Sequence, residues 1–110
     1  MLTSPQDFKA LQQRGSMRSH PLLSARVLRT DLATTRFGLA TSRALGSAVA
    51  RNRVRRRLRE AIRLLLPSIR PGWDVLVIAR PAIARAEYGA ISAALARLLG
   101  RAGVLVEGGE

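Results

Sequence analysis

The sequence contains no cysteine, so it can form neither disulfides nor thiolate metal sites, which fits a cytosolic protein. It also has few acids, seven against nineteen basic residues, and only one histidine and one lysine. No apolar run approaches the roughly 20 residues of a membrane span, and the N-terminal residues lack the basic-then-apolar layout of a signal peptide. We therefore expect a cytoplasmic protein that makes no contact with a membrane.

The 110 residues suffice for one domain, expected over residues 1–110 with an ordered core at about 5–100. The net charge of +12 opposes compaction and favours association with polyanions. A basic domain of this kind indicates nucleic-acid binding first and an anionic membrane second. The preference for Arg over Lys is typical of a GC-rich genome, but genome composition does not explain why the arginines cluster.

The pattern of apolar residues predicts an α+β domain in the order helix, two or three strands, helix, strand, helix. Ser4-Pro5 is a helix start and Gly15 a helix end, while residues 16–21 form a loop or a short edge strand. Alternating or continuous apolar residues predict three strands, and helical spacing predicts two more helices. The expected strands are 22–29, 36–43 and 73–79, the expected helices 48–66 and 84–99, and the tail from residue 100 is frayed unless 104–106 packs locally.

The helix at 48–66 carries the strongest functional signal. Six of the nine residues from Arg51 to Arg59 are arginine, and Glu60 is its only acid. At 100° per residue an apolar stripe faces the core and a wide cationic arc faces outward. Unpaired like charges at this spacing cost stability, so the arc indicates a polyanionic partner rather than a solvated surface. The buried stripe is expected to contain Val54, Leu58, Ala61, Ile62 and Leu65.

This helix and its flanks closely resemble the protein subunit of bacterial ribonuclease P. The segment Ala48 to Glu60 contains the family's arginine–asparagine–arginine signature at Arg51-Asn52-Arg53. Arg36 to Arg43 resembles the strand before the signature, Asp7 to Gly15 the first helix, and Val75 to Pro81 the last strand. The resemblance covers residues 5–100 approximately, and its central motif is highly specific.

The resemblance implies a fold like domain 2 of ribosomal protein S5, in the order α-β-β-(β)-α-β-α, with a left-handed βαβ crossover where general rules favour a right-handed one. It implies that the protein assists a catalytic RNA, which uses magnesium to remove the 5′ leader of precursor tRNA. The protein alone is expected to be inactive, monomeric apart from its RNA, without a metal site, and bound to both the ribonuclease P RNA and precursor tRNA. The RNA-binding residues carried over are Arg43, Arg51, Asn52, Arg53, Arg55, Arg56 and Arg59.

The family holds the leader in a cleft between the first helix and the sheet. Here the small residues Gly38, Ala40 and Ser42 are expected to form its floor, and Phe8 its wall, although Phe8 fits the core equally well. Gln12 and Arg26 stand where the family often has aromatic residues, and these two departures favour phosphate contact over stacking. The family usually has lysine at the position of Arg43. The expected cleft residues are Phe8, Gln12, Arg14, Arg26, Gly38, Ala40 and Ser42.

Other functions are less well supported by the residues. A protein-only enzyme lacks paired carboxylates or metal-ligand spacing, and His20 is expected to be an exposed loop residue. The alternative to a ribonuclease P role is a ribosomal-type or other structured-RNA-binding protein. DNA binding and a membrane-surface helix rank lower, because neither a helix-turn-helix nor Trp and Phe anchors are visible.

Overall fold

The computed structural model describes residue 2 and residues 4–106, and it has the predicted α+β architecture. The described residues form three α-helices and four strands, of which β1, β2 and β3 follow one another directly, and three short 3-10 turns. In order they are α1 (Pro5–Arg14), β1 (Ser16–Ser19), β2 (Leu23–Arg29), β3 (Arg36–Ala40), η1 (Arg43–Leu45), α2 (Ala48–Leu65), η2 (Leu66–Ser68), β4 (Trp73–Ala79), η3 (Pro81–Arg85) and α3 (Tyr88–Arg101).

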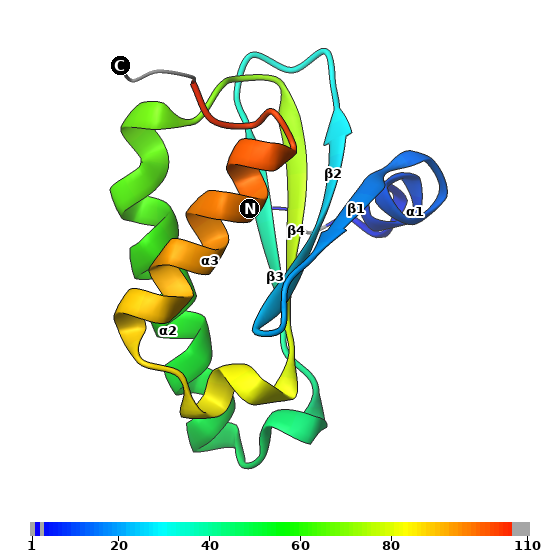
Figure 1. Ribbon diagram of the computed structural model, residues 1–110. Helices are drawn as coiled ribbons and strands as arrows, with labels where there is room; N and C mark the ends of the chain where they lie inside the picture. The colour runs from blue at the N-terminus through cyan, green and yellow to red at the C-terminus, as the bar shows by residue number, and fades with distance from the viewer. Residues whose placement is uncertain (1, 3, 107–110) are drawn as a thin grey trace.

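The four strands form one mixed sheet in the order β1-β2-β4-β3 (Figure 1). The segment that the sequence left open between loop and strand is the edge strand β1, which pairs antiparallel with β2. The central strand β4 pairs antiparallel with β2 and parallel with β3. Because β3 and β4 are parallel, α2 forms the crossover between them, and the predicted left hand of this crossover stays a prediction.

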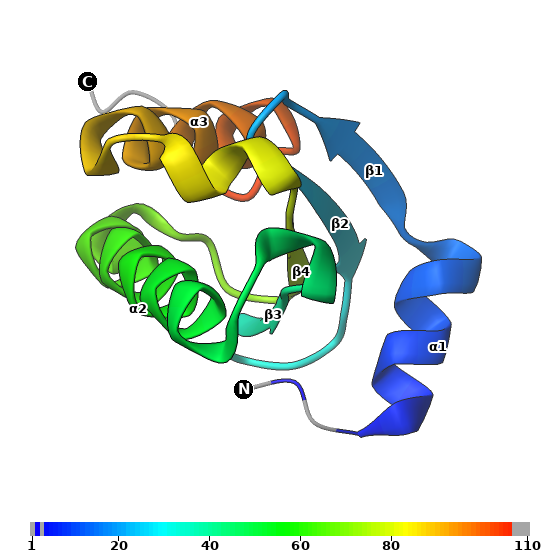
Figure 2. The same ribbon diagram turned by 90° about the horizontal axis from the view of Figure 1, so that it is seen from below.

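The helices lie on both faces of the sheet (Figure 2). Helices α2 and α3 pack side by side on one face, and α1 crosses the other face alone. Strand β4 is therefore covered on both sides, as its nearly continuous apolar sequence predicted, and five of its seven residues are buried.

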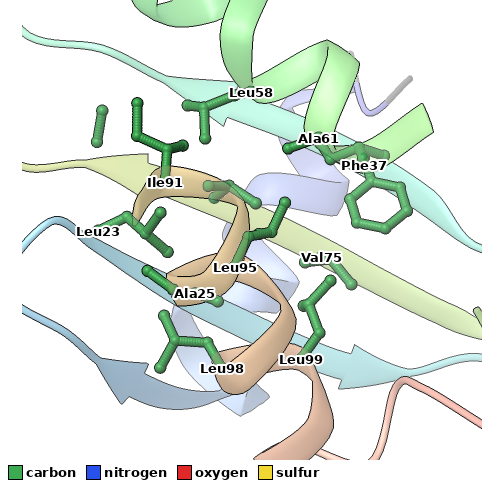
Figure 3. Close-up of a cluster of buried hydrophobic side chains, with 14 of the residues drawn as sticks. Leu23, Ala25, Phe37, Leu58, Ala61, Val75, Ile91, Leu95, Leu98 and Leu99 are labelled. Carbon is green, nitrogen blue, oxygen red and sulfur yellow. The ribbon is translucent and has the colours of Figure 1, made fainter. Parts of the chain in front are cut away.

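The main core lies between the sheet and the α2–α3 layer (Figure 3). Alternation along β2 sends Leu23, Ala25 and Val27 into this core, as predicted. The stripe expected on α2 is confirmed, since four of its members are buried and Leu65 packs against them. A second, smaller cluster under α1 consists of Leu2, Leu11 and Leu76, with Phe8, Leu28, Ala40 and Ile78 packed around it.

Two predicted boundaries are wrong. The strand expected over 36–43 ends at Ala40, because Ser42 starts a 3-10 turn in which its Oγ accepts a hydrogen bond from Ala44 N at 3.2 Å. The last helix begins at Tyr88 rather than at residue 84. Pro81 opens a separate 3-10 turn, and the chain becomes extended at Ala86, whose carbonyl accepts a hydrogen bond from Arg57 Nη1.

The ends of the chain contribute to the packing beyond the expected range of 5–100. Leu2 is buried on the α1 side, and Val104 is buried in the main core. The backbone N–H groups of Arg70 and Val106 donate to Val104 and Ser68, so the tail packs locally over residues 104–106. Within the described residues, no helix is both long enough and apolar enough to cross a membrane.

Candidate nucleic-acid interface

Helix α2 starts at a well-formed cap and presents its basic arc to solvent. Gly46 has a positive φ of 114°, which a side chain would disfavour, and Ser47 Oγ then accepts a hydrogen bond from Ala50 N at 3.2 Å. The 18 residues of the helix span about 27 Å. Burial of one stripe holds the helix against the core, so the opposite side is free for a partner.

Five of the seven residues predicted to bind RNA lie together on this side of α2. Asn52, Arg53, Arg56 and Arg59 are exposed, and Arg55 is half-buried with its Nη1 donating to Asn52 Oδ1 at 3.2 Å. A shallow depression of about 350 Å³ is lined by Asn52, Arg55, Arg56 and Arg59. Arg51 lies half-buried in the first turn, and Arg43 is exposed in the turn η1 just upstream.

The charge of this face has no compensation inside the described part of the chain. None of the arginines from Arg51 to Arg59 forms an ion pair with a carboxylate among residues 2 and 4–106. Glu60 is engaged by Arg63 at 2.6 Å, and this hydrogen bond lowers the pKa of Glu60. The face therefore offers several free guanidinium groups, which suit phosphate oxygens in number and geometry.

The residues expected in the leader cleft divide between the two flanks of α1. Leu11 points into the sheet, Phe8 and Gln12 lie on one flank, and Arg14 lies on the other with Asp7. Arg26 Nη1 reaches the carbonyl of Gln12 at 3.4 Å, so it belongs with the Phe8 flank. Arg14 instead lines a cavity of about 430 Å³ on the far flank.

The expected floor of the cleft is open at one end only. Gly38 is buried, and a Cβ placed on it would lie 3.3 Å from Leu2 Cβ and 3.4 Å from Phe8 Cε1. Ala40 is half-buried and Ser42 is exposed. A ligand on this face would therefore meet the sheet at Ala40, beside the turn that Ser42 begins, while Leu2 and Phe8 cover the Gly38 end.

The sequence reasoning missed a cluster of charged residues beneath α1. Arg36 donates through Nε and Nη2 to the two carboxylate oxygens of Asp74, at 2.9 and 2.7 Å, and through Nη1 to Asp7 Oδ2 at 3.1 Å. The hydrogen bond to Asp74 and, less strongly, that to Asp7 raise the pKa of Arg36. Asp74 could have indicated this cluster from the sequence, since an acid inside a strand predicted to be buried needs a charged or hydrogen-bonding partner.

His20 lies in a loop, as predicted, but it is half-buried rather than exposed. Its Nδ1 accepts a hydrogen bond from the backbone N–H of Leu22 at 3.0 Å, which shapes the turn between β1 and β2.

Among the residues described, no three His, Cys, Asp or Glu side chains come close enough together to hold a metal ion.

Known proteins resemble this chain over nearly its whole length. A sequence model of the Ribonuclease P family matches residues 1–103. The ribonuclease P protein component of Herpetosiphon aurantiacus is 43% identical over 101 residues, covering 92% of this chain and 82% of that protein. The protein of the same name from Roseiflexus castenholzii is 40% identical, covering 94% and 86%.

Solved structures show the same fold. The RNase P protein of Staphylococcus aureus superposes with a TM-score of 0.86 at 25% sequence identity, covering 94% of both chains. The RNase P protein from Thermotoga maritima superposes with a TM-score of 0.84 at 25% identity, covering 97% of both chains.

Proposed function

Because the chain belongs to the ribonuclease P protein family, we propose that it supplies binding while its RNA partner supplies catalysis. The chain is the protein subunit of a ribonucleoprotein endoribonuclease, it acts in tRNA processing, and its partner is the ribonuclease P RNA.

The observation that carries the proposal is the uncompensated basic face of α2. Its guanidinium groups have no carboxylate partners among the described residues, so phosphate oxygens of a folded RNA are suitable acceptors. We assign this contact to Arg43, Arg51, Asn52, Arg53, Arg55, Arg56 and Arg59. Phosphate contacts fix position without reading sequence, so the shape of the RNA provides the specificity.

The second part of the proposal is that the sheet face under α1 binds the 5′ leader of precursor tRNA. Phe8 offers an aromatic surface on one flank of α1, while Gln12 and Arg26 offer polar and cationic groups beside it. Ala40 and Ser42 leave the adjacent floor accessible, whereas Gly38 is covered and Arg14 lies on the other flank. Contact with a leader therefore centres on the Ala40–Ser42 end.

The remaining parts concern the chemistry and the assembly. Magnesium acts through the RNA and the substrate, the protein alone does not cleave RNA, and the protein is monomeric apart from its RNA and works in the cytoplasm. The lack of a nucleophile–base pair in the sequence supports this division, since cleavage by the protein would require such a set.

Reconstitution tests the division of labour. Addition of the protein to its cognate RNA at low magnesium should increase the rate of precursor tRNA cleavage, because the bound arginines offset phosphate repulsion. The protein without RNA should give no product. Absence of stimulation would overturn the binding role, and cleavage by protein freed of RNA would overturn the assignment of catalysis.

The leader contact has a separate test. We define the leader ratio as kcat/KM for a precursor with a long leader divided by kcat/KM for one with a single-nucleotide leader. Phe8→Ala should lower the leader ratio about fivefold, because stacking on one aromatic contributes about 1 kcal/mol or more. An unchanged ratio with a lower unfolding free energy would show that Phe8 serves only the core.

A further inference from the structure

Arg36 joins three elements of the fold through one guanidinium group. The register of β3 against β4 places Arg36 directly opposite Asp74, and both carboxylate oxygens of Asp74 accept from it. Asp74 is 3% exposed, and the pairing compensates the cost of burying its carboxylate. The remaining amino group, Nη1, is directed at Asp7 in the first turn of α1. The buried pair thus fixes the guanidinium, and the guanidinium holds the helix.

Helix α1 has few other attachments to the sheet. Leu11 is its only buried residue, and Phe8 packs at the margin of the same small cluster. One buried side chain fixes the distance between a helix and a sheet but leaves rotation about the helix axis weakly restrained. Within the described residues, the Asp7–Arg36 contact is the only ion pair that α1 makes, and it lies at the N-terminal end, next to Phe8.

We propose that Arg36 is a positioning residue for leader binding, which acts by fixing the rotation of α1 through Asp7. This inference rests on the proposed leader contact. Asp7 and Arg36 line the cavity on the flank of α1 away from Phe8 and Gln12, so they set the direction of those side chains without lying in their path. Asp74 keeps Arg36 in place, and Arg36 keeps the helix in place.

A direct role for Arg36 as a phosphate contact predicts the opposite sign for one substitution. If Arg36 bound the leader itself, then Asp7→Asn would remove a competing negative charge and strengthen leader binding. If Arg36 positions α1, the same substitution weakens leader binding, because a neutral amide holds the guanidinium less tightly than a carboxylate does. The sign of the change therefore separates the two roles.

The experiment measures the leader ratio with the reconstituted holoenzyme at fixed salt. Asp7→Asn should lower the ratio about fivefold, as expected for loss of one well-oriented ion pair. Arg36→Lys should lower it similarly although the charge is kept, because an ammonium group cannot reproduce the fork that spans both carboxylates. Asp7→Glu should lower the leader ratio by no more than half as much as Asp7→Asn does, since the glutamate carboxylate can still reach Arg36.

The matched control is Asp31→Asn, which makes the same change of charge in the exposed segment 31–34, and Asp31 lines the same cavity. This variant should leave the leader ratio unchanged. Affinity for the ribonuclease P RNA should also stay unchanged in all four variants, because α2 is not touched. Urea unfolding is measured to check that each variant is folded under the assay conditions. A fall in the leader ratio of a folded variant then reports a change in the position of α1.

Two outcomes would overturn the inference, and they differ in what else they affect. If the unsubstituted protein shows no preference for a long leader, the proposed leader contact fails and the role of Arg36 fails with it. If that preference is present but Asp7→Asn keeps or increases it, the leader contact stands and only the positioning role of Arg36 is wrong.

Discussion

Arginine occupies two contrasting environments in this molecule. Beneath α1, Arg36 is held by two carboxylates from two elements, one of them buried. Along α2, the arginines from Arg51 to Arg59 lie near one another and have no carboxylate partner among the described residues. The fold supplies the counter-charge of Arg36, so that side chain is structural. What distinguishes the α2 face, which we propose binds RNA, is that several arginines without a carboxylate partner in the described chain gather on one helix.

The contrast extends to the energetics of the two sites. Breaking the Arg36–Asp74 pair leaves a buried carboxylate or an unsatisfied guanidinium, so its loss is expected to destabilise the fold. The α2 arginines repel one another at i,i+4 spacing, and removing one relieves that repulsion. Changes in the first site should therefore appear in unfolding and changes in the second in binding.

The largest expected effect is on unfolding, from Asp74→Ala. Removal of the carboxylate strands part of the Arg36 guanidinium and should reduce the free energy of unfolding by about 2 kcal/mol, measured by urea denaturation. The salt dependence of RNA binding should not change. Asp31→Ala is the control, since this exposed acid should alter unfolding by less than about 0.5 kcal/mol. If Asp74→Ala and Asp31→Ala lowered the free energy of unfolding equally, the ion pair of Asp74 would contribute no special stability.

A smaller effect, on binding, is expected from Arg53→Ala and Arg56→Ala. Each should weaken affinity for the ribonuclease P RNA about fivefold and reduce the slope of log K against log salt by about one. Their free energies of unfolding should stay within about 0.5 kcal/mol of the original. An unchanged salt slope would show that these side chains do not contact phosphate, and the uncompensated face would then need another explanation.

The smallest effect is expected at Glu60, where the two environments meet on one helix. The pKa of Glu60 is lowered by its hydrogen bond from Arg63, so the pair stabilises the fold above the unfolded pKa of about 4.3. That contribution is lost as the pH falls through the lower folded value. Glu60→Gln should abolish this dependence of the unfolding free energy on acidic pH. It should also raise the affinity for RNA by no more than about twofold, because it frees Arg63. Lower affinity would show that Glu60 contributes to the interface.

Periodicity in the sequence predicted most of the fold. The alternation in β2, the apolar run of β4 and the stripe on α2 each reflect burial that a local pattern records. One wrong boundary, the early end of β3, reflects local capping by Ser42, and the other depends on a contact distant in sequence. Helix α3 starts late because Ala86 is extended and bonded to Arg57, 29 residues away, and no local pattern contains that bond.

The candidate site shows the same limit. The basic arc was predictable because all of its residues belong to one helix of known pitch. The cluster of Asp7, Arg36 and Asp74 was not, because its members come from three elements and meet only through the register of the sheet. Likewise, the cover that Leu2 places over Gly38 depends on tertiary packing that the sequence does not display.

The place of β4 at the centre of the sheet has a consequence for synthesis. Both β2 and β3 precede it in the chain, and each needs it as a neighbour, so the sheet cannot close until Trp73–Ala79 has left the ribosome. Helix α2 leaves earlier, with its arginines exposed and its apolar stripe still uncovered. For that interval the nascent chain presents its most cationic segment, unfolded, to the RNA-rich surface on which it is being made.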